Sequence, residues 1–309
     1  MYMKFRSTVI LTMMLLASSM LKAQDADTTY WTSGGFVALT FSNVTLSESW
    51  AAGGAENVSV NAATGLFANY AKARTTWENS LDMGYGVINQ DNQGFEKSDD
   101  KINLVTKYGY QIKNGNSKWY FSGLLDFRTQ FAIGEDVVES STGADSTITI
   151  SDFMAPGYLT VGLGIDYKPN KVLSFNYIPL TGKFTFVNNQ ALSDQGAYGV
   201  DPGKKSRAEL GSFLRIKYKD EVMKNVNLES RLELFTNYVE SFGTIDVNWQ
   251  NTVVMKINKV LSANLFTHLL YDEDIKMEPE DGGTPEAKVQ FKSVFGAGLA
   301  YNFGAQVSK

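Results

Sequence analysis

The feature that most constrains this chain of 309 residues is a strict alternation of apolar and polar side chains. Between Val58 and Tyr70 every second residue is apolar or tolerable in lipid, and small or polar residues such as Ser59, Asn61 and Asn69 lie between them. The same period recurs in three further stretches, which are 77–87, 119–131 and 226–238. A period of two places successive side chains on opposite faces of a β-strand. The chain is therefore expected to fold as long strands, each with one apolar and one polar face.

Continuing this pattern predicts about twelve strands, most of them about ten to fourteen residues long. They are 34–46, 57–70, 75–88, 101–112, 118–131, 158–167, 172–187, 208–219, 226–239, 245–257, 261–271 and 289–303. An even count suits a closed antiparallel barrel, and these lengths suit a tilted crossing of a hydrocarbon core. No later stretch offers about 20 consecutive apolar residues, which excludes a helical membrane protein. We predict an all-β fold, a closed antiparallel transmembrane β-barrel formed within residues 24–309.

The connections between the predicted strands alternate between short and long. The short ones lie near 72–74, 114–116, 169–170, 221–225 and 258–259, and the long ones near 47–56, 89–100, 132–157, 188–207 and 272–288. Only the link near Phe242 breaks this rule. Outer-membrane barrels have short periplasmic turns and long extracellular loops, so both termini are predicted to be periplasmic. Pro179 lies inside a predicted strand and indicates that this strand is bent, bulged or broken.

Aromatic residues cluster near the predicted strand ends. The inner-rim set is Trp77, Tyr110, Trp119, Tyr167, Tyr218 and Phe303, and the outer-rim set is Phe131, Tyr158, Phe186, Tyr238, Trp249 and Tyr271. Two such girdles are typical of transmembrane barrels. The alternative is a soluble β-sandwich whose aromatics fill its core, but a sandwich protects its edge strands with charge, and here nearly every strand has an apolar face.

The N-terminus is predicted to be a cleaved signal peptide over residues 1–23. Lys4 and Arg6 precede the apolar run Val9–Ala17, which is too short to span a bilayer, and cleavage is placed near Ala23. The alternative is a buried N-terminal helix. An exported chain with this strand pattern is expected in the cell outer membrane.

Composition excludes several classes of protein. The chain has no cysteine and one histidine, so disulfides, thiolate zinc sites, cysteine nucleophiles and multi-histidine metal sites are excluded. Its net charge of −5 argues against a nucleic-acid partner. No cofactor is expected.

Three segments resemble a known family: Thr40–Asn57, which contains Trp50-Ala51-Ala52-Gly53-Gly54, then Trp77–Gly86 and Pro179–Thr185. In this order they are similar to the Bacteroidota domain-of-unknown-function 3078 family of outer-membrane β-barrel proteins, and the resemblance extends over essentially the whole mature chain. It implies a location and a barrel fold. It implies no activity and no catalytic residues.

The strand period directs many charged side chains towards the barrel lumen. The candidate lumen-lining residues are Glu78, Asp82, Lys107, Asp126, Arg128, Arg215, Glu229, Arg231, Glu233, Lys256 and His268. Their signs nearly balance, and a barrel of twelve strands is narrow, so the groups are expected to pair with one another. They form either a small polar conduit or a closed, salt-bridged core.

An enzymatic function would require His268 as the sole general base. A phospholipase-like arrangement would place a serine two residues away, where this chain has Leu270, and a protease-like pair would use Asp272 or Asp274. Nothing in the sequence fixes such a geometry, so the protein is predicted not to be an enzyme.

Two loops carry further candidate sites. The loop 272–288 is rich in acids and is either a weak calcium or partner site or, more simply, a solvated charged loop. Trp50, Gly53 and Gly54 lie in the first long connection, where they are either a partner or mouth contact or a rim anchor.

The sequence thus favours a narrow passive channel or binder for small solutes. The competing hypothesis is a closed structural barrel that acts as an accessory subunit of a larger outer-membrane complex. The expected partners are the outer-membrane bilayer and, in the second case, other envelope proteins; the sequence does not indicate an oligomeric state.

Overall fold

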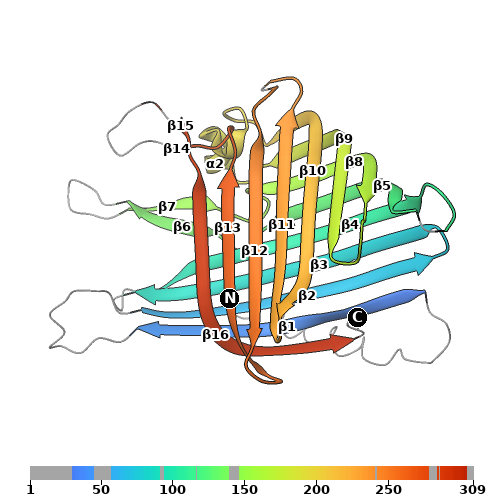
Figure 1. The fold of residues 1–309 in the computed structure, drawn as a ribbon. Coiled ribbons are helices and arrows are strands. Elements are labelled where there is room, and N and C mark those ends of the chain that lie inside the picture. The colour runs from blue at the N-terminus through green and yellow to red at the C-terminus, as the bar shows by residue number, and fades with distance from the viewer. Residues whose placement is uncertain are drawn as a thin grey trace. The chain divides into compact units, whose positions relative to one another are not determined.

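A computed structural model describes residues 30–44, 57–90, 94–115, 117–138, 146–240, 242–277, 284 and 286–304. Within them, twelve strands close into an antiparallel barrel, in the order β1-β16-β13-β12-β11-β10-β9-β8-β5-β4-β3-β2. The strands are β1 (Trp31–Val44), β2 (Asn57–Lys72), β3 (Thr75–Gln90), β4 (Phe95–Gln111), β5 (Trp119–Thr129), β8 (Gly157–Tyr167), β9 (Leu173–Phe186), β10 (Ser206–Met223), β11 (Val226–Asn237), β12 (Asp246–Lys256), β13 (Leu261–Tyr271) and β16 (Gln290–Gly304). In Figure 1, β10–β13 and β16 form the near wall and β1–β4 the far wall. The predicted fold class is confirmed.

The barrel has a short-turn end and a long-loop end. The short turns are 73–74, 112–118, 168–172, 224–225 and 257–260, and β1 begins and β16 ends beside them. Most connections at the other end are longer: 45–56, 130–156, 187–205, 238–245 and 272–289. The predicted alternation of loop lengths is therefore confirmed for these connections, except that 238–245, which was expected to be a short link, is also longer than most of the short turns.

The predicted start of β4 is wrong. We expected this strand to begin at residue 101 after a long connection, but β4 begins at Phe95 and only residues 91–94 link it to β3. Gly86 pairs with Asp99 and Val87 with Lys97, which leaves one extra residue, Ser98, in a β-bulge. A bulge reverses the alternation, and the polar run that contains it hides the strand from a period-two pattern.

The irregularity predicted at Pro179, a bend, a bulge or a break, is a bulge. On one side Leu163 pairs with Leu180 and Ile165 with Tyr177, so β9 has one more residue than β8 over the same stretch. The same extra residue occurs against β10. Pro179 lies within this bulge, where its missing N–H removes no ladder hydrogen bond. The strand is bulged but continuous.

Three of the long connections carry secondary structure that the sequence pattern does not predict. They contain the hairpin β6 (Gly134–Val138) and β7 (Ser146–Ser151), the helix α2 (Gln190–Asp194) with the 3₁₀ turn η2 (Ala197–Gly199), and the pair β14 (Lys276–Met277) and β15 (Glu286–Ala287). A small apolar cluster, formed by Ala155, Val187, Leu192 and Val200, packs the first two of these connections together. No helix among the described residues is long and apolar enough to cross a membrane.

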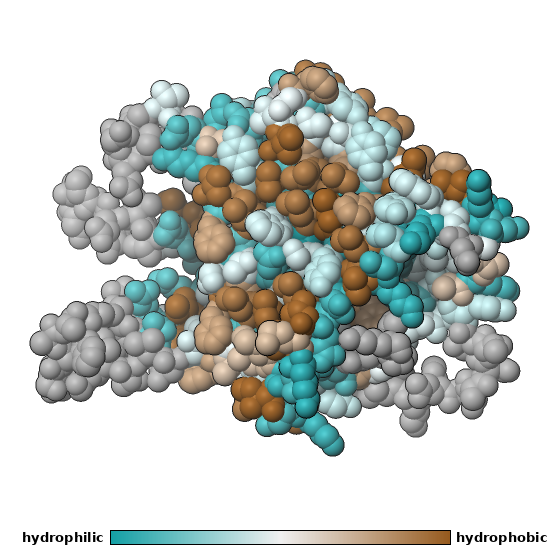
Figure 2. Space-filling model, in the orientation of Figure 1, coloured by the Kyte–Doolittle hydropathy of each residue, from teal (hydrophilic) through white to brown (hydrophobic). Residues whose placement is uncertain are grey.

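Apolar side chains cover much of the barrel face seen in Figure 2. Large exposed side chains include Leu39, Phe41, Leu104, Leu163, Leu180, Leu210, Phe291, Phe295, Leu299 and Tyr301. Aromatic rings group near the short-turn end, where Trp31 lies 5.3 Å from Tyr70 and 5.7 Å from Trp77 between ring centroids. One row of polar residues interrupts the apolar face where β11, β12, β13 and β16 pair in register; its members are Ser230, Asn251, Thr267 and Ser293.

Tyr158 does not belong to the outer girdle. It pairs in register with Arg128, and registered partners share one face of a sheet. Arg128 contacts residues across the barrel interior, so Tyr158 also faces inward. The strand-end position suggested a rim residue, but the register decides the face.

Candidate functional site: the barrel interior

Ion pairs between strands that are not neighbours identify the barrel interior. Arg215 of β10 contacts Asp126 of β5, Lys183 of β9 lies 2.8 Å from Asp246 of β12, and two further strands separate each pair in the sheet. Such contacts can form only by crossing the inside of the barrel. They fix which face of each strand points inward.

The best buried of these contacts form a four-residue network, which we call the Asp126 network. Arg128 donates from Nε to Asp126 Oδ1 at 2.9 Å and also contacts Glu233. Arg215 donates from Nε to Glu233 Oε1 at 2.8 Å and also contacts Asp126. The side chains of Asp126 and Glu233 are 2% and 4% exposed. Two carboxylates and two guanidinium groups thus neutralise each other in a dry environment.

An apolar cluster adjoins the Asp126 network. Its buried members are Leu124, Ile178, Phe213 and Phe235. The Arg215 guanidinium lies 5.2 Å from the Phe213 ring centroid, and Lys183 Nζ lies 4.9 Å from that of Phe235. Together the network and the cluster form a packed core on the side of β5, β8, β9, β10 and β11. We call this part the dry side.

A second inward network lies near the short-turn end. Lys107 Nζ is 2.8 Å from Asp166 Oδ2 and 3.2 Å from Glu78 Oε2, and Lys168 contacts both carboxylates. Burial by itself would lower the pKa of Lys168, but the carboxylates of Glu78 and Asp166 raise it above its ordinary value. Sequence reasoning missed Lys168 because it lies in a turn, where strand alternation gives no direction.

The opposite part of the interior contains a row of small side chains, although Phe36 and Phe67 of neighbouring rows also face inward. One registered row runs from β16 to β3 through Ala300, Ala38, Ala63 and Gly84, and ends at Lys101 of β4. The row faces inward because Lys101 Nζ lies 4.9 Å from the ring centroid of Phe266 on β13, across the barrel. A side chain at Gly84 would approach Lys101 Cε to 3.1 Å, so the glycine leaves room for the lysine stem.

Charged groups on this small-residue side are accessible to water. Lys292 Nζ lies 2.7 Å from Asp99 Oδ1, and these side chains are 38% and 31% exposed. Near the short-turn end, on the parts of β10 and β11 that extend past the packed cluster, Lys217 Nζ lies 2.9 Å from Glu229 Oε1; these side chains are 43% and 35% exposed, and we count the pair with the wet side. The contrast with the Asp126 network divides the interior into a dry side and a wet side.

Asp82, Arg231 and His268 lie between the two wet ion pairs. The charges acting on Asp82 are those of Arg231, Glu229, Lys101 and Lys217. Arg231 NH2 donates to Gln250 Oε1 at 2.6 Å. His268 Nε2 lies 2.9 Å from Asn248 Oδ1, and Asn248 Nδ2 donates to Glu233 Oε2 at 3.2 Å. Amides of β12 therefore connect the wet side to the Asp126 network.

Ten of the eleven candidate lumen residues belong to these networks or to the wet side between them. Lys256 differs, because it is exposed at the last position of β12, where its backbone N–H donates to Asn225 O at 2.8 Å. That these residues line a working conduit stays a prediction. Trp50, Gly53, Gly54 and the predicted signal peptide lie outside the described residues.

The protease-like pairing considered for His268 does not form. Asp272 Oδ2 lies 3.2 Å from Lys183 Nζ, and Asp274 Oδ2 lies 2.7 Å from Arg207 NH1, whereas the hydrogen-bond partner of His268 is Asn248. These carboxylates fix the start of the loop after β13 to the barrel wall. Within the described part of the chain, no group of three or more histidine, aspartate or glutamate side chains is placed to hold a metal ion. The absence of enzymatic activity stays a prediction.

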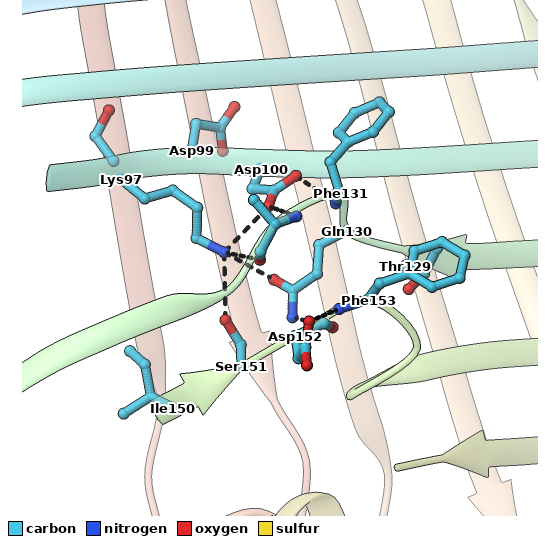
Figure 3. A network of polar contacts seen from close by, with 12 residues as sticks. Lys97, Asp99, Asp100, Thr129, Gln130, Phe131, Ile150, Ser151, Asp152 and Phe153 are labelled. Carbon is cyan, nitrogen blue, oxygen red and sulfur yellow. Dashed lines mark hydrogen bonds and ion pairs between the residues drawn. The ribbon is translucent and has the colours of Figure 1, made fainter. Parts of the chain in front are cut away.

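A polar network at the long-loop end was missed by sequence reasoning (Figure 3). Asp100 accepts hydrogen bonds from the backbone N–H groups of Phe131 and Ala132, at 2.7 and 2.9 Å. Lys97 Nζ lies 3.1 Å from Asp100 Oδ2 and donates to the carbonyl oxygen of Ala132 at 2.8 Å. The network fixes the connection between β5 and β8 to β4. The sequence signal that could have indicated this network is a run of charged residues in a segment that we expected to be a loop.

Comparison with known proteins finds one family. Residues 41–134 match the model of a family described as "Protein of unknown function (DUF3078)". The predicted relationship is confirmed over those residues, which include most of the first resembling segment and all of the second. The third segment, Pro179–Thr185, lies outside the match, and the Bacteroidota source stays a prediction. No curated protein matches the chain.

Several solved outer-membrane barrels are weakly similar in structure. The COG4313 outer membrane channel from Pseudomonas putida F1 is 11% identical with a TM-score of 0.40, over 91% of this chain and 98% of that one. The translocator domain of the autotransporter NalP from Neisseria meningitidis is 12% identical with a TM-score of 0.36, over 96% of each chain. The NanC porin is 9% identical with a TM-score of 0.36, over 88% and 98%. The barrel assignment rests on the strand pairing of this chain itself.

Proposed function

We propose that this chain, whose residues 41–134 match a family of unknown function, is a narrow outer-membrane channel or binder for small solutes. The observation that carries this proposal is the division of the interior. Charged pairs on the wet side are about one third exposed or more, while the carboxylates of the Asp126 network are almost completely buried. A barrel that served only as a rigid support would gain stability if both sides of its interior were packed.

The apolar exterior supports placement in a bilayer. Leu39, Phe41, Phe295 and Leu299 expose about half of their surface or more on one face of β1 and β16. A soluble protein rarely exposes so continuous an apolar surface, whereas a closed barrel in lipid requires one. Together with the predicted signal peptide, this supports residence in the outer membrane.

The proposed passage follows the small side chains of β16, β1, β2 and β3. It begins at Lys292 and Asp99 at the long-loop end, passes Lys101 and Asp82, and ends near Glu229 at the short-turn end. The row Ala300, Ala38, Ala63 and Gly84 gives this wall small side chains, whereas the Phe36 ring lies over Gly65 and narrows the wall beside Asp82. Asp82, Lys101 and Arg231 give this space a polar lining suited to small hydrophilic solutes.

Two adjacent alanines provide a matched test. Ala63 faces inward and Ala62 faces outward, because successive residues of β2 point to opposite faces. We expect Ala63→Leu to reduce the single-channel conductance of the purified mature protein in a planar bilayer, and Ala62→Leu to leave it unchanged. Equal conductance of both variants and the wild type would contradict the proposed path.

A second candidate function is a closed accessory barrel within a larger envelope complex. The observation that favours it is that two contacts cross the wet side, Lys292 with Asp99 and Lys101 with Phe266. Absence of any conductance from a correctly folded sample would support this function. Isolation of the barrel with stable envelope partners would then be the next measurement.

A further inference from the structure

We infer that the wet side of the barrel favours small anions, and that Lys101 is the main residue that sets this preference. The inference rests on the proposed channel function and adds the class of solute. It follows from the balance of charge on the wet side, from the surroundings of Lys101 and from the position of the remaining acids.

The charges of the wet side do not balance. Its cationic side chains are Lys101, Lys217, Lys219, Arg231 and Lys292, and its carboxylates are Asp82, Asp99 and Glu229. The second inward network adds Glu78 and Asp166 against Lys107 and Lys168, which leaves the difference unchanged. Asp99 is bound to Lys292, and Glu229 lies within 3 Å of both Lys217 and Lys219. A surplus of positive charge therefore lies along the passage and would attract anions.

Lys101 is the cation with the fewest partners at the centre of this passage. Among the described residues it takes part in no ion pair, and its ammonium group packs on the Phe266 ring across the barrel. Its ammonium group can therefore bind a passing anion without first breaking a salt bridge. Lysine presents a flexible point charge, which suits transient contact better than a fixed bidentate clamp would.

Other cationic groups near Lys101 would also attract an anion. The strongest charge interactions of His268 are with Arg128, Lys101, Arg231 and Lys292. The nearest acid to Arg231 is Glu233, at 3.6 Å, and that carboxylate already binds Arg128 and Arg215. Asp82 is the opposing negative charge at this level of the passage.

Apart from Asp99, the acids that pair with Lys183 and Arg207 at the long-loop end lie on the other side of the barrel. Lys183 lies within 4 Å of carboxylate oxygens of Glu209, Asp246 and Asp272, and Arg207 binds Asp274 and Glu240. Lys183 and Arg207 belong to β9 and β10, and the Lys183 ammonium packs on Phe235 of the dry side. These acids are already paired with Lys183 and Arg207, and the pairs hold loops to the dry side.

The test is the reversal potential of the purified mature protein in a planar bilayer under a potassium chloride gradient. We expect the sign that indicates chloride preference for the wild type, and a shift towards zero for Lys101→Gln. Asp82→Asn should shift the potential in the opposite direction from Lys101→Gln, towards stronger chloride preference. The matched control is Lys171→Gln, which removes the same charge from an exposed turn and should leave the potential unchanged.

Each outcome has a distinct meaning. Steady openings without preference, or with potassium preference, would overturn this inference and leave the channel function standing. A chloride preference that Lys101→Gln and Asp82→Asn leave unaltered would overturn the role of Lys101. Silence from protein that still shows the heat-dependent gel shift of a closed barrel would overturn the inference and the channel function together.

Discussion

Asp126 and Glu233 show how this barrel tolerates charge in a dry interior. Each carboxylate contacts both Arg128 and Arg215, and each is almost completely buried. Burying a charge is costly unless it is paired and hydrogen-bonded, and here each charge has two partners. The network therefore tolerates the loss of a partner far less well than an exposed pair does.

We predict that Arg215→Met destabilises the barrel by about 3–5 kcal/mol, because two buried carboxylates would then share one guanidinium. The measurement is the free energy of unfolding in urea, followed by the heat-dependent gel shift. Lys217→Met, two residues along the same strand, removes a half-exposed partner and should cost less than about 1 kcal/mol. Similar losses for both variants would show that the Asp126 network is not a buried, interdependent unit.

At the scale of single elements, the connection between β5 and β8 is ordered by β4. This connection contains the hairpin β6–β7, and it is held where β4 extends past the end of β5, through Asp100 and Lys97. Gln130 Nε2 adds hydrogen bonds to the carbonyl oxygens of Asp152 and Ala155, at 3.0 and 3.1 Å. The first and last residues of the loop are thereby fixed to each other and to the barrel.

We predict that Asp100→Ala frees this loop without opening the barrel. The backbone N–H groups of Phe131 and Ala132 would lose their carboxylate acceptor, a loss of about 1.5–3 kcal/mol for a charged hydrogen bond. Their amide hydrogen exchange should accelerate by about one to two orders of magnitude, and the loop should become more sensitive to protease. Asp99→Ala is the matched control, since Asp99 faces the lumen and binds Lys292 instead. Unchanged exchange in Asp100→Ala would contradict the anchoring role.

At the scale of the whole molecule, closure depends on the seam between β1 and β16. These strands pair from Gly34 with Gly304 to Phe41 with Ala297, joining segments more than 250 residues apart in sequence. Closure satisfies the backbone groups that would otherwise form two free sheet edges. The natural chain has no cysteine, so this seam can be tested by introducing a single pair.

We predict that Val37→Cys combined with Tyr301→Cys forms a disulfide on oxidation, because these residues pair in register on the outer face. After protease has cut the loops, the oxidised product should still retain its folded mobility on a gel. Val37→Cys combined with Asn302→Cys is the control, since Asn302 points to the opposite face and its Cβ cannot reach. Equal crosslinking of both pairs would contradict the register of the seam.

The sequence by itself determined the twelve strands, the ends at which short and long connections lie, and the bulge at Pro179. These features are local, because side-chain direction in a strand depends only on position and proline blocks a ladder hydrogen bond wherever it stands. The start of β4 and the inward face of Tyr158 needed the tertiary structure. A bulge reverses which side chains of a strand point inward, and the pairing register decides on which face a residue at a strand end lies.

Which charges meet was also decided only by closure. Arg128 binds Glu233 from 105 residues away because the stagger of the closed sheet brings β5 opposite β11. Closure also packed Leu124, Ile178, Phe213 and Phe235 together and left other inward ion pairs exposed, a separation of a dry side from a wet side that the alternating pattern alone does not distinguish.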